Sequence, residues 1–191
     1  RYADDGVIHC RSKKEAEHIL GELSERMKQC KLQIHPDKSK IVYCRSDKFG
    51  ENHDNEEFDF LGYTFRTRSA RNKEGKFFNV FSPAVSKDAA KSFREKIRET
   101  VKLSRTKSLE ILAEKLNPII RGWMNYFSVF RSREARKEID YVNQVLVRWL
   151  RRGFKTVSRS WGKAWRMLAR IAKSTPAIFY HWQKGIKPTI G

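Results

Sequence analysis

The sequence has few cysteines and no closely spaced pair of them. Its three cysteines, Cys10, Cys30 and Cys44, stand far apart, and no C-x-x-C motif is present. This spacing argues against a zinc ribbon or finger, and the odd count argues against the disulfide framework of a small secreted protein. The five histidines show no metal-ligand spacing either. These residues therefore give no sign of a structural zinc site.

Long apolar runs, internal repeats and low-complexity segments are also absent. No stretch approaches the ~18 apolar residues of a membrane-spanning helix, and no signal peptide is recognisable. We therefore expect an intracellular protein with no membrane partner. Because the first residue is Arg1 rather than methionine, we also expect a longer parent protein with an upstream segment.

Acidic residues are missing from the C-terminal part of the chain. No Asp or Glu follows Asp140, whereas residues 151–191 hold ten Lys/Arg. The 191 residues together have 41 Lys/Arg and 22 Asp/Glu, a net charge of +19, and residues 86–191 carry +17 of it. Because rows of cations bind phosphates, this charge distribution predicts a polyanionic partner.

The apolar spacing predicts an α+β fold whose strands lie in the first part of the chain. Ser12 and Glu15 form a capping box that should open a helix at about Lys13. Short runs rich in β-branched and aromatic residues predict strands at Ile41–Cys44, Phe58–Phe65 and Phe77–Phe81, of which the second is broken by one glycine.

From Ser86 the apolar period becomes helical, and we expect a bundle of three or four helices. An asparagine followed by a proline, Asn117-Pro118, predicts that one helix begins there. A final helix should span about 160–173. The predicted buried stripe of the helix after Pro118 consists of Ile119, Trp123, Tyr126, Phe127 and Phe130.

The chain opens on Tyr2-Ala3-Asp4-Asp5-Gly6, which predicts a hairpin around the two aspartates. Two adjacent carboxylates at a tight turn offer the hard oxygen ligands that Mg²⁺ prefers. Two such ions can clamp the attacking and leaving oxygens of a phosphoryl transfer. The competing interpretation is a solvated Asp-Asp-Gly turn, and the segments that follow decide between the two.

The order of motifs resembles group II intron-encoded reverse transcriptases, also called maturases. Tyr2–Asp5, Pro36–Val42 and Phe60–Tyr63 are similar to the second half of a reverse-transcriptase palm, and Leu116–Phe127 is similar to the thumb, or maturase domain X. The resemblance implies part of a palm at 1–85, a helical thumb at 86–152 and a basic helical tail at 153–191 that binds RNA or DNA. It places the protein in the bacterial cytoplasm or an organelle.

The resemblance also implies an RNA-directed DNA polymerase that binds its own intron RNA and assists its splicing. Mg²⁺ would be the cofactor, and the partners would be group II intron RNA, a primer–template and deoxynucleotide triphosphates. The alternative is an RNA-binding maturase or splicing factor without polymerase activity. A third interpretation, another bacterial reverse transcriptase, fits the run at 116–127 poorly.

In this family a third catalytic carboxylate comes from an earlier palm strand, so we expect residues 1–191 alone to be inactive. We also expect no endonuclease domain.

In the palm part, the resemblance assigns three kinds of site. Asp4 would be the stronger metal ligand and Asp5 the accessory one, and Lys38 would neutralise or protonate the leaving pyrophosphate. For Lys38 the alternative is an ordinary turn lysine, and for the aromatic residues Phe60 and Phe65 it is core packing. The predicted primer grip consists of Phe60, Leu61, Gly62 and Tyr63, where a glycine would let a nucleic-acid strand approach closely.

In the helical part, Arg121 and Asn125 lie four residues apart on one helix face. A side chain that forks to phosphate and one that can read a base edge suit RNA, although a helix-capping or inter-helix hydrogen-bond pair is the alternative. Gly122 predicts close helix packing or close approach of RNA. Further cations recur from Arg131 to Lys173, with Trp161, Trp165 and Trp182 interleaved, and predict RNA contact rather than a merely solvated face. The residues expected to bind RNA are Arg121, Asn125, Arg148, Arg151, Arg152, Arg166 and Arg170.

Overall fold

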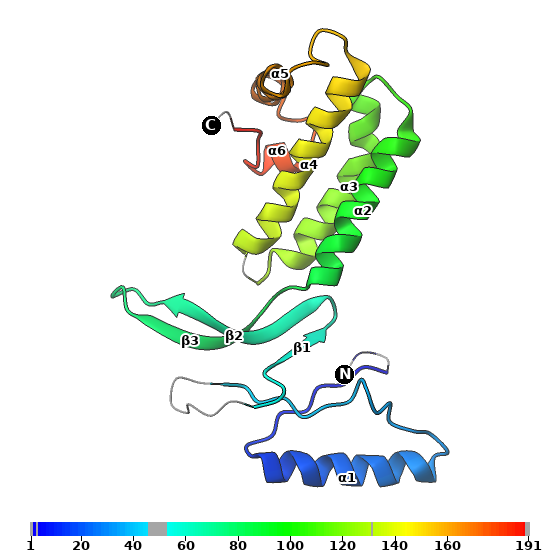
Figure 1. The fold of residues 1–191 in the computed structure, drawn as a ribbon, viewed down its shortest axis with the longest axis vertical. Helices are drawn as coiled ribbons and strands as arrows, with labels where there is room; N and C mark the ends of the chain where they lie inside the picture. The colour runs from blue at the N-terminus through cyan, green and yellow to red at the C-terminus, as the bar shows by residue number, and fades with distance from the viewer. Residues whose placement is uncertain (1, 3, 46–52, 131, 190–191) are drawn as a thin grey trace. The chain divides into compact units, whose positions relative to one another are not determined.

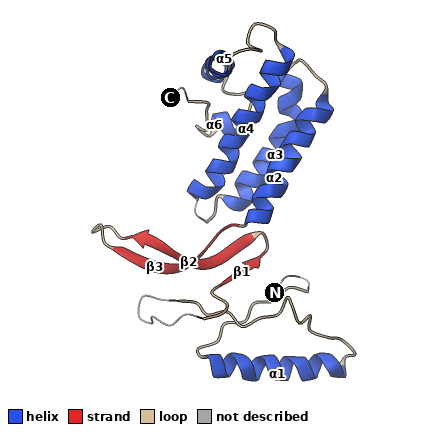
Figure 2. Cartoon of the chain, viewed as in Figure 1, coloured by secondary structure: helices blue, strands red, loops and turns tan. Residues whose placement is uncertain are grey.

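The chain folds into two compact units, Arg1–Ser82 and Pro83–Gly191. The structure is a computed structural model that describes residues 2, 4–45, 53–130 and 132–189. Over these residues, the first unit holds one helix and most of a three-stranded sheet, and the second is helical apart from the end of the last strand (Figure 2). This arrangement confirms the predicted α+β class.

The helix of the first unit, α1 (Lys13–Gln29), begins where its capping residues predict. The Ser12 hydroxyl accepts a hydrogen bond of 3.2 Å from the Glu15 N–H. The Glu15 carboxylate in turn accepts one of 2.7 Å from the Arg11 N–H, one residue before the partner that a standard capping box uses. The apolar stripe of α1 is half-buried, and no residue of the helix is fully buried.

The sheet has the strand order β1 (Glu57–Phe60), β2 (Tyr63–Arg71) and β3 (Phe77–Val85). Figure 1 shows the hairpin that β2 and β3 form. β1 and β2 pair antiparallel, with Phe58 opposite Phe65. Those two rings stack with their centres 4.9 Å apart, and Phe58 also stacks on Phe81 at 6.1 Å. Aromatic contacts across the three strands therefore form one face of the sheet.

Two strand predictions in the first unit are wrong. Phe58–Phe65 was expected to form one strand broken by a glycine, but the chain reverses at Leu61 and Gly62 and makes a hairpin instead. Ile41–Cys44 forms no strand, and its backbone is tied down by a hydrogen bond of 2.8 Å from the Tyr43 N–H to the Asn55 carbonyl. A strand needs a ladder of such bonds rather than local propensity alone.

In the second unit, three long helices lie side by side: α2 (Lys87–Ser104), α3 (Leu109–Phe127) and α4 (Ser132–Gly153) (Figure 1). α5 (Trp161–Ser174) packs on α4, and the short α6 (Tyr180–Gln183) packs on α3. The predicted bundle and the helix expected at about 160–173 are thus confirmed, but that helix is not the final one, because α6 follows it. Fully buried side chains form its core, among them Ile97, Leu112, Leu116, Ile120, Ile139, Leu146 and Leu168.

The prediction that a helix begins at Pro118 is wrong, because α3 runs through this proline without a break. A proline inside a helix costs about 3 kcal/mol, since it removes one backbone hydrogen bond. Leu112 and Leu116 before it and Ile120 after it are all fully buried. Burial of each such side chain stabilises the fold by about 1.5–3 kcal/mol, which outweighs the cost of the proline.

The buried stripe of α3 also differs in phase from the predicted one. Trp123 and Phe127 are buried as expected, but Tyr126 is 47% exposed and Phe130 is 46% exposed. Because α3 begins at Leu109, its core face is set by the residues before the proline, and Tyr126 falls on the flank. Across the described residues, every helix is too short or too polar to traverse a bilayer.

Candidate nucleic-acid interface

The two aspartates lie at a tight turn near the start of the first unit. Tyr2 and Asp5 exchange two backbone hydrogen bonds of 2.9 Å each, so the turn closes one residue earlier than the predicted hairpin. Asp4 and Asp5 are both exposed. Two exposed carboxylates suit Mg²⁺, which proteins often bind through one or two carboxylates together with substrate phosphates. Among the described residues, no third acidic, histidine or cysteine side chain joins them in a metal-binding cluster.

Lys38 lies in a separate turn of the same unit. The turn spans Pro36–Lys38, and the Ser39 N–H donates a hydrogen bond of 3.1 Å to the His35 carbonyl. The Lys38 side chain is exposed. Exposure is compatible with both interpretations of this lysine, a contact to pyrophosphate and an ordinary turn lysine.

The four residues of the predicted primer grip form the β1–β2 turn. Phe60 pairs with Tyr63, and the two residues between them have left-handed backbone, with φ of 49° at Leu61 and 77° at Gly62. This is the geometry of a two-residue type I′ hairpin turn, which favours Asn-Gly. Leucine in that conformation is strained, typically by about 1–2 kcal/mol. Tyr63 is buried, and the other three residues are half-buried.

Arg121 and Asn125 are both exposed on α3, and the structure ties Arg121 to the C-terminal segment. The Arg121 guanidinium lies 5.1 Å from the centre of the Tyr180 ring, and the Lys184 ammonium lies 5.5 Å from the same centre. Such cation–π contacts hold both cations near one exposed part of the bundle. Sequence reasoning missed Tyr180 and Lys184, because nothing local links them to a helix about sixty residues earlier.

Gly122 lies on the same exposed surface of α3. A Cβ built at this position meets no atom within 4 Å, so close helix packing within the described chain is not the reason for the glycine. An exposed glycine inside a helix costs about 1 kcal/mol relative to alanine. The second predicted reason, close approach of RNA, stays a prediction.

The end of α4 and the start of α5 form what we call the cation–aromatic cluster, made of Arg148, Arg151, Trp161 and Trp165. The two guanidiniums lie 5.9 and 5.5 Å from the ring centre of Trp161, which is 41% exposed. Trp161 stacks with Trp165 at 6.3 Å. Arg148 also lies 5.7 Å from the ring of Tyr141, another residue that the sequence did not indicate. The cluster presents two cations and an aromatic face together.

The remaining predicted RNA-binding residues are exposed as well. Arg152 follows Arg151 on α4, and Arg166 and Arg170 lie one turn apart on α5. Arg131, the first of the recurring cations, lies outside the described residues. The exposed residues extend the positive surface along α5.

Trp182 does not belong to this surface, and the prediction that it could stack on a base is wrong. It is fully buried, and its indole N–H donates a hydrogen bond of 2.8 Å to Oδ1 of Asn143. The same oxygen lies 3.0 Å from Nε2 of the buried His181. Burial lowers the pKa of His181 to about 3, so the ring is neutral at pH 7. This buried network holds the C-terminal segment on the bundle.

Comparison with known families gives one match in each unit. Residues 90–172 match the model described as "Group II intron, maturase-specific domain", and residues 1–65 match the model described as "Reverse transcriptase (RNA-dependent DNA polymerase)". No curated protein matches the chain. The predicted catalytic and primer-grip residues all lie in the reverse-transcriptase match, and the predicted RNA-binding residues all lie in the maturase match.

Proposed function

The chain belongs to the group II intron reverse transcriptases/maturases, and we propose that its unit Pro83–Gly191 binds intron RNA through the cation–aromatic cluster. The observation that carries this proposal is that Arg148 and Arg151 both lie over the exposed ring of Trp161. Unpaired bases stack on exposed aromatic rings or on the planes of arginine guanidiniums, and arginines also bind the flanking phosphates. The surrounding charge supports the same partner, since no acidic residue follows Asp140.

Within this unit, we propose a division of labour between two surfaces. The cation–aromatic cluster with Arg152, Arg166 and Arg170 supplies affinity for any RNA, because phosphate contacts carry little sequence information. Arg121 and Asn125 on α3 supply preference for the intron. In domain terms, residues 86–152 form the thumb and residues 153–191 the basic tail.

For the first unit, residues 1–85, we propose the role of a reverse-transcriptase palm part. Asp4 and Asp5 would hold Mg²⁺, which in such a polymerase stabilises the charge on the triphosphate. Lys38 would face the pyrophosphate, and the primer grip would contact the primer strand, with deoxynucleotide triphosphates as substrates. The family match and the exposed carboxylate pair favour this role over a maturase that only assists splicing, since RNA binding alone does not need the carboxylates.

Filter binding with group II intron RNA and an unrelated structured RNA, at several salt concentrations, tests the RNA proposal. Trp161→Ala should weaken binding of both RNAs roughly tenfold. Arg148→Gln with Arg151→Gln should also flatten the log–log salt dependence, by up to about 0.9 for each lost phosphate contact. Arg121→Gln should reduce the preference for intron RNA instead.

Matched controls separate these effects from loss of total charge and from folding. Lys102→Gln with Lys107→Gln removes two exposed cations elsewhere in the unit, and should weaken binding less than the cluster variants. Asp4→Ala should leave RNA affinity nearly unchanged. Salt-independent affinity, or equal losses from the cluster and control pairs, would contradict the proposed interface.

Primer extension with Mg²⁺ and deoxynucleotides tests the palm proposal. Residues 1–191 alone should not extend a primer, because Asp4 and Asp5 need a further carboxylate. Robust extension by this chain would show that the two aspartates suffice. If a longer parent protein extends primers, Asp4→Ala in that parent should abolish synthesis while RNA binding persists. Continued synthesis would remove Asp4 from the catalytic site.

A further inference from the structure

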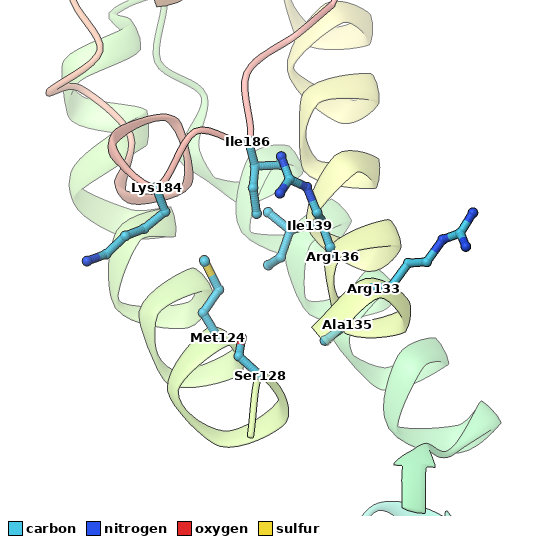
Figure 3. A pocket seen from close by; sticks show the side chains of 8 residues that line it. All are labelled: Met124, Ser128, Arg133, Ala135, Arg136, Ile139, Lys184 and Ile186. Atoms are coloured by element: carbon cyan, nitrogen blue, oxygen red, sulfur yellow. The ribbon is translucent and has the colours of Figure 1, made fainter. Parts of the chain in front are cut away.

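A pocket of about 380 Å³ opens between α3, α4 and the C-terminal segment, away from the cation–aromatic cluster. Its centre is apolar. Figure 3 shows the side chains of Met124, Ile139 and Ile186 facing this hollow from three different elements. A volume of this size lies at the small end of sites that take one small molecule or one residue of a polymer.

The rim of the pocket is cationic. Lys184 and Arg133 extend to opposite sides of the opening, and the Arg136 guanidinium lies beside Ile186 (Figure 3). None of the eight lining residues is acidic. Arg136 donates a hydrogen bond of 3.2 Å to the Gly185 carbonyl, which leaves further N–H donors on its guanidinium. An apolar centre inside a cationic rim suits a ligand with a flat apolar part and anionic groups on either side.

The rim continues towards the predicted RNA-binding surface of α3. Lys184 lies against the Tyr180 ring, and Arg121 lies against the same ring. Cations therefore follow one another from Arg133 and Lys184 to Arg121. Exposed Gly122 lies next to Arg121, with open space where a side chain would be. A phosphate backbone could follow this path.

We propose that the pocket receives one unpaired nucleotide of the bound RNA. Its base would lie against the half-buried Met124, above a floor formed by the buried Ile139 and Ile186. Its flanking phosphates would contact Arg133, Arg136 and Lys184. Sequence-specific RNA recognition relies largely on bases that are splayed out of a helix, and a bulge presents one such base. This inference rests on the proposed RNA binding and adds the class of RNA feature that the bundle recognises.

The test compares two short RNA hairpins that differ by one bulged uridine, measured by fluorescence anisotropy with the full chain. The wild-type chain should bind the bulged hairpin roughly fivefold or more tightly, which is the range expected for contact with one base. Arg133→Gln with Lys184→Gln should reduce that ratio to about one. Met124→Gln, which keeps the side-chain length but makes the pocket polar, should reduce it too.

The matched control is Lys91→Gln with Lys96→Gln, two exposed cations on α2. This pair removes the same charge and should weaken both hairpins while preserving the ratio. With 4-thiouridine at the bulge, ultraviolet cross-links should map to peptides that contain Met124 or Ile186. Equal affinity of the wild-type chain for both hairpins, or an unchanged ratio in the pocket variants, would overturn the pocket proposal and leave RNA binding intact. Binding of neither hairpin, nor of intron RNA, would overturn the proposed function as well.

Discussion

The backbone N–H of Tyr180 donates a hydrogen bond of 2.8 Å to Oδ1 of Asn117, across 63 residues of sequence. Nδ2 of the same side chain donates one of 2.9 Å to the Ile178 carbonyl. One asparagine in the middle of α3 thus satisfies two backbone groups of the C-terminal segment. This contact positions Tyr180, and through its ring Arg121 and Lys184.

Asn117→Ala should therefore destabilise the chain and loosen the C-terminal segment. Two half-buried backbone groups would lose their partners, which should lower the free energy of unfolding by roughly 2 kcal/mol. Urea denaturation measures this loss, and hydrogen exchange at Tyr180 reports the loosening. Asn125→Ala, at an exposed position on the same helix, should change stability by less than about 0.5 kcal/mol. Similar losses in the two variants would show that the Asn117 contacts contribute little.

Gly122→Ala should stabilise the protein. The position is exposed inside α3, and an added Cβ meets nothing within 4 Å, so the gain should approach the helix-propensity difference of about 1 kcal/mol. Thermal denaturation measures it, with Gly21→Ala in α1 as a second exposed glycine with the same open space. If the α3 surface meets RNA closely, Gly122→Ala should also weaken intron binding, whereas Gly21→Ala should not. A destabilised Gly122→Ala would show that the helix needs the glycine for its own folding.

Sequence patterns predicted the features that depend on neighbouring residues. Helices begin after Ser12 and after Ser86 because each serine hydroxyl accepts a hydrogen bond from the N–H group three residues later. Residue type and spacing in the sequence are enough to predict such a contact. The same local rule failed at Asn117, because its side chain is bonded to Ile178 and Tyr180 instead. Burial on both sides of Pro118 then kept the helix continuous.

The candidate interface shows the same limit. The charge distribution indicated Arg148 and Arg151 as RNA-binding residues, but only the packing of α5 on α4 shows that Trp161 lies beneath both. Trp182, like Trp161, is a tryptophan with basic residues nearby in the sequence, yet it is buried against Asn143. Which tryptophan faces solvent is decided by long-range contacts, which residue type and charge do not encode. The hairpin turn at Leu61 was missed because leucine is unusual at a positive φ.

The buried network around Asn143 should make stability depend on pH through His181. Nε2 of His181 donates to Oδ1 of Asn143, and within the described chain no group bonds its Nδ1. Protonation of Nδ1 would place a charge in the core, and burial accordingly lowers the pKa to about 3 from 6.5. The unfolded chain takes up this proton below about pH 6.5, whereas the folded chain does so only near pH 3. The stabilising effect of the neutral ring is therefore complete above about pH 6.5 and is lost as the pH falls towards 3, at about 1.4 kcal/mol for each pH unit.

Urea denaturation of the wild-type chain and of His181→Gln between pH 7 and pH 4.5 measures this dependence. Glutamine can still donate to Asn143 but does not titrate, so its free energy of unfolding should fall less steeply with acid than that of the wild-type chain. His18→Gln, at an exposed position on α1, should keep the wild-type slope, because it leaves the buried His181 and its contact with Asn143 in place. The difference between the wild-type and His181→Gln slopes isolates this one residue from the carboxylates that also protonate in acid. Parallel slopes in all three proteins would show that His181 takes up its proton as readily in the folded chain as in the unfolded one.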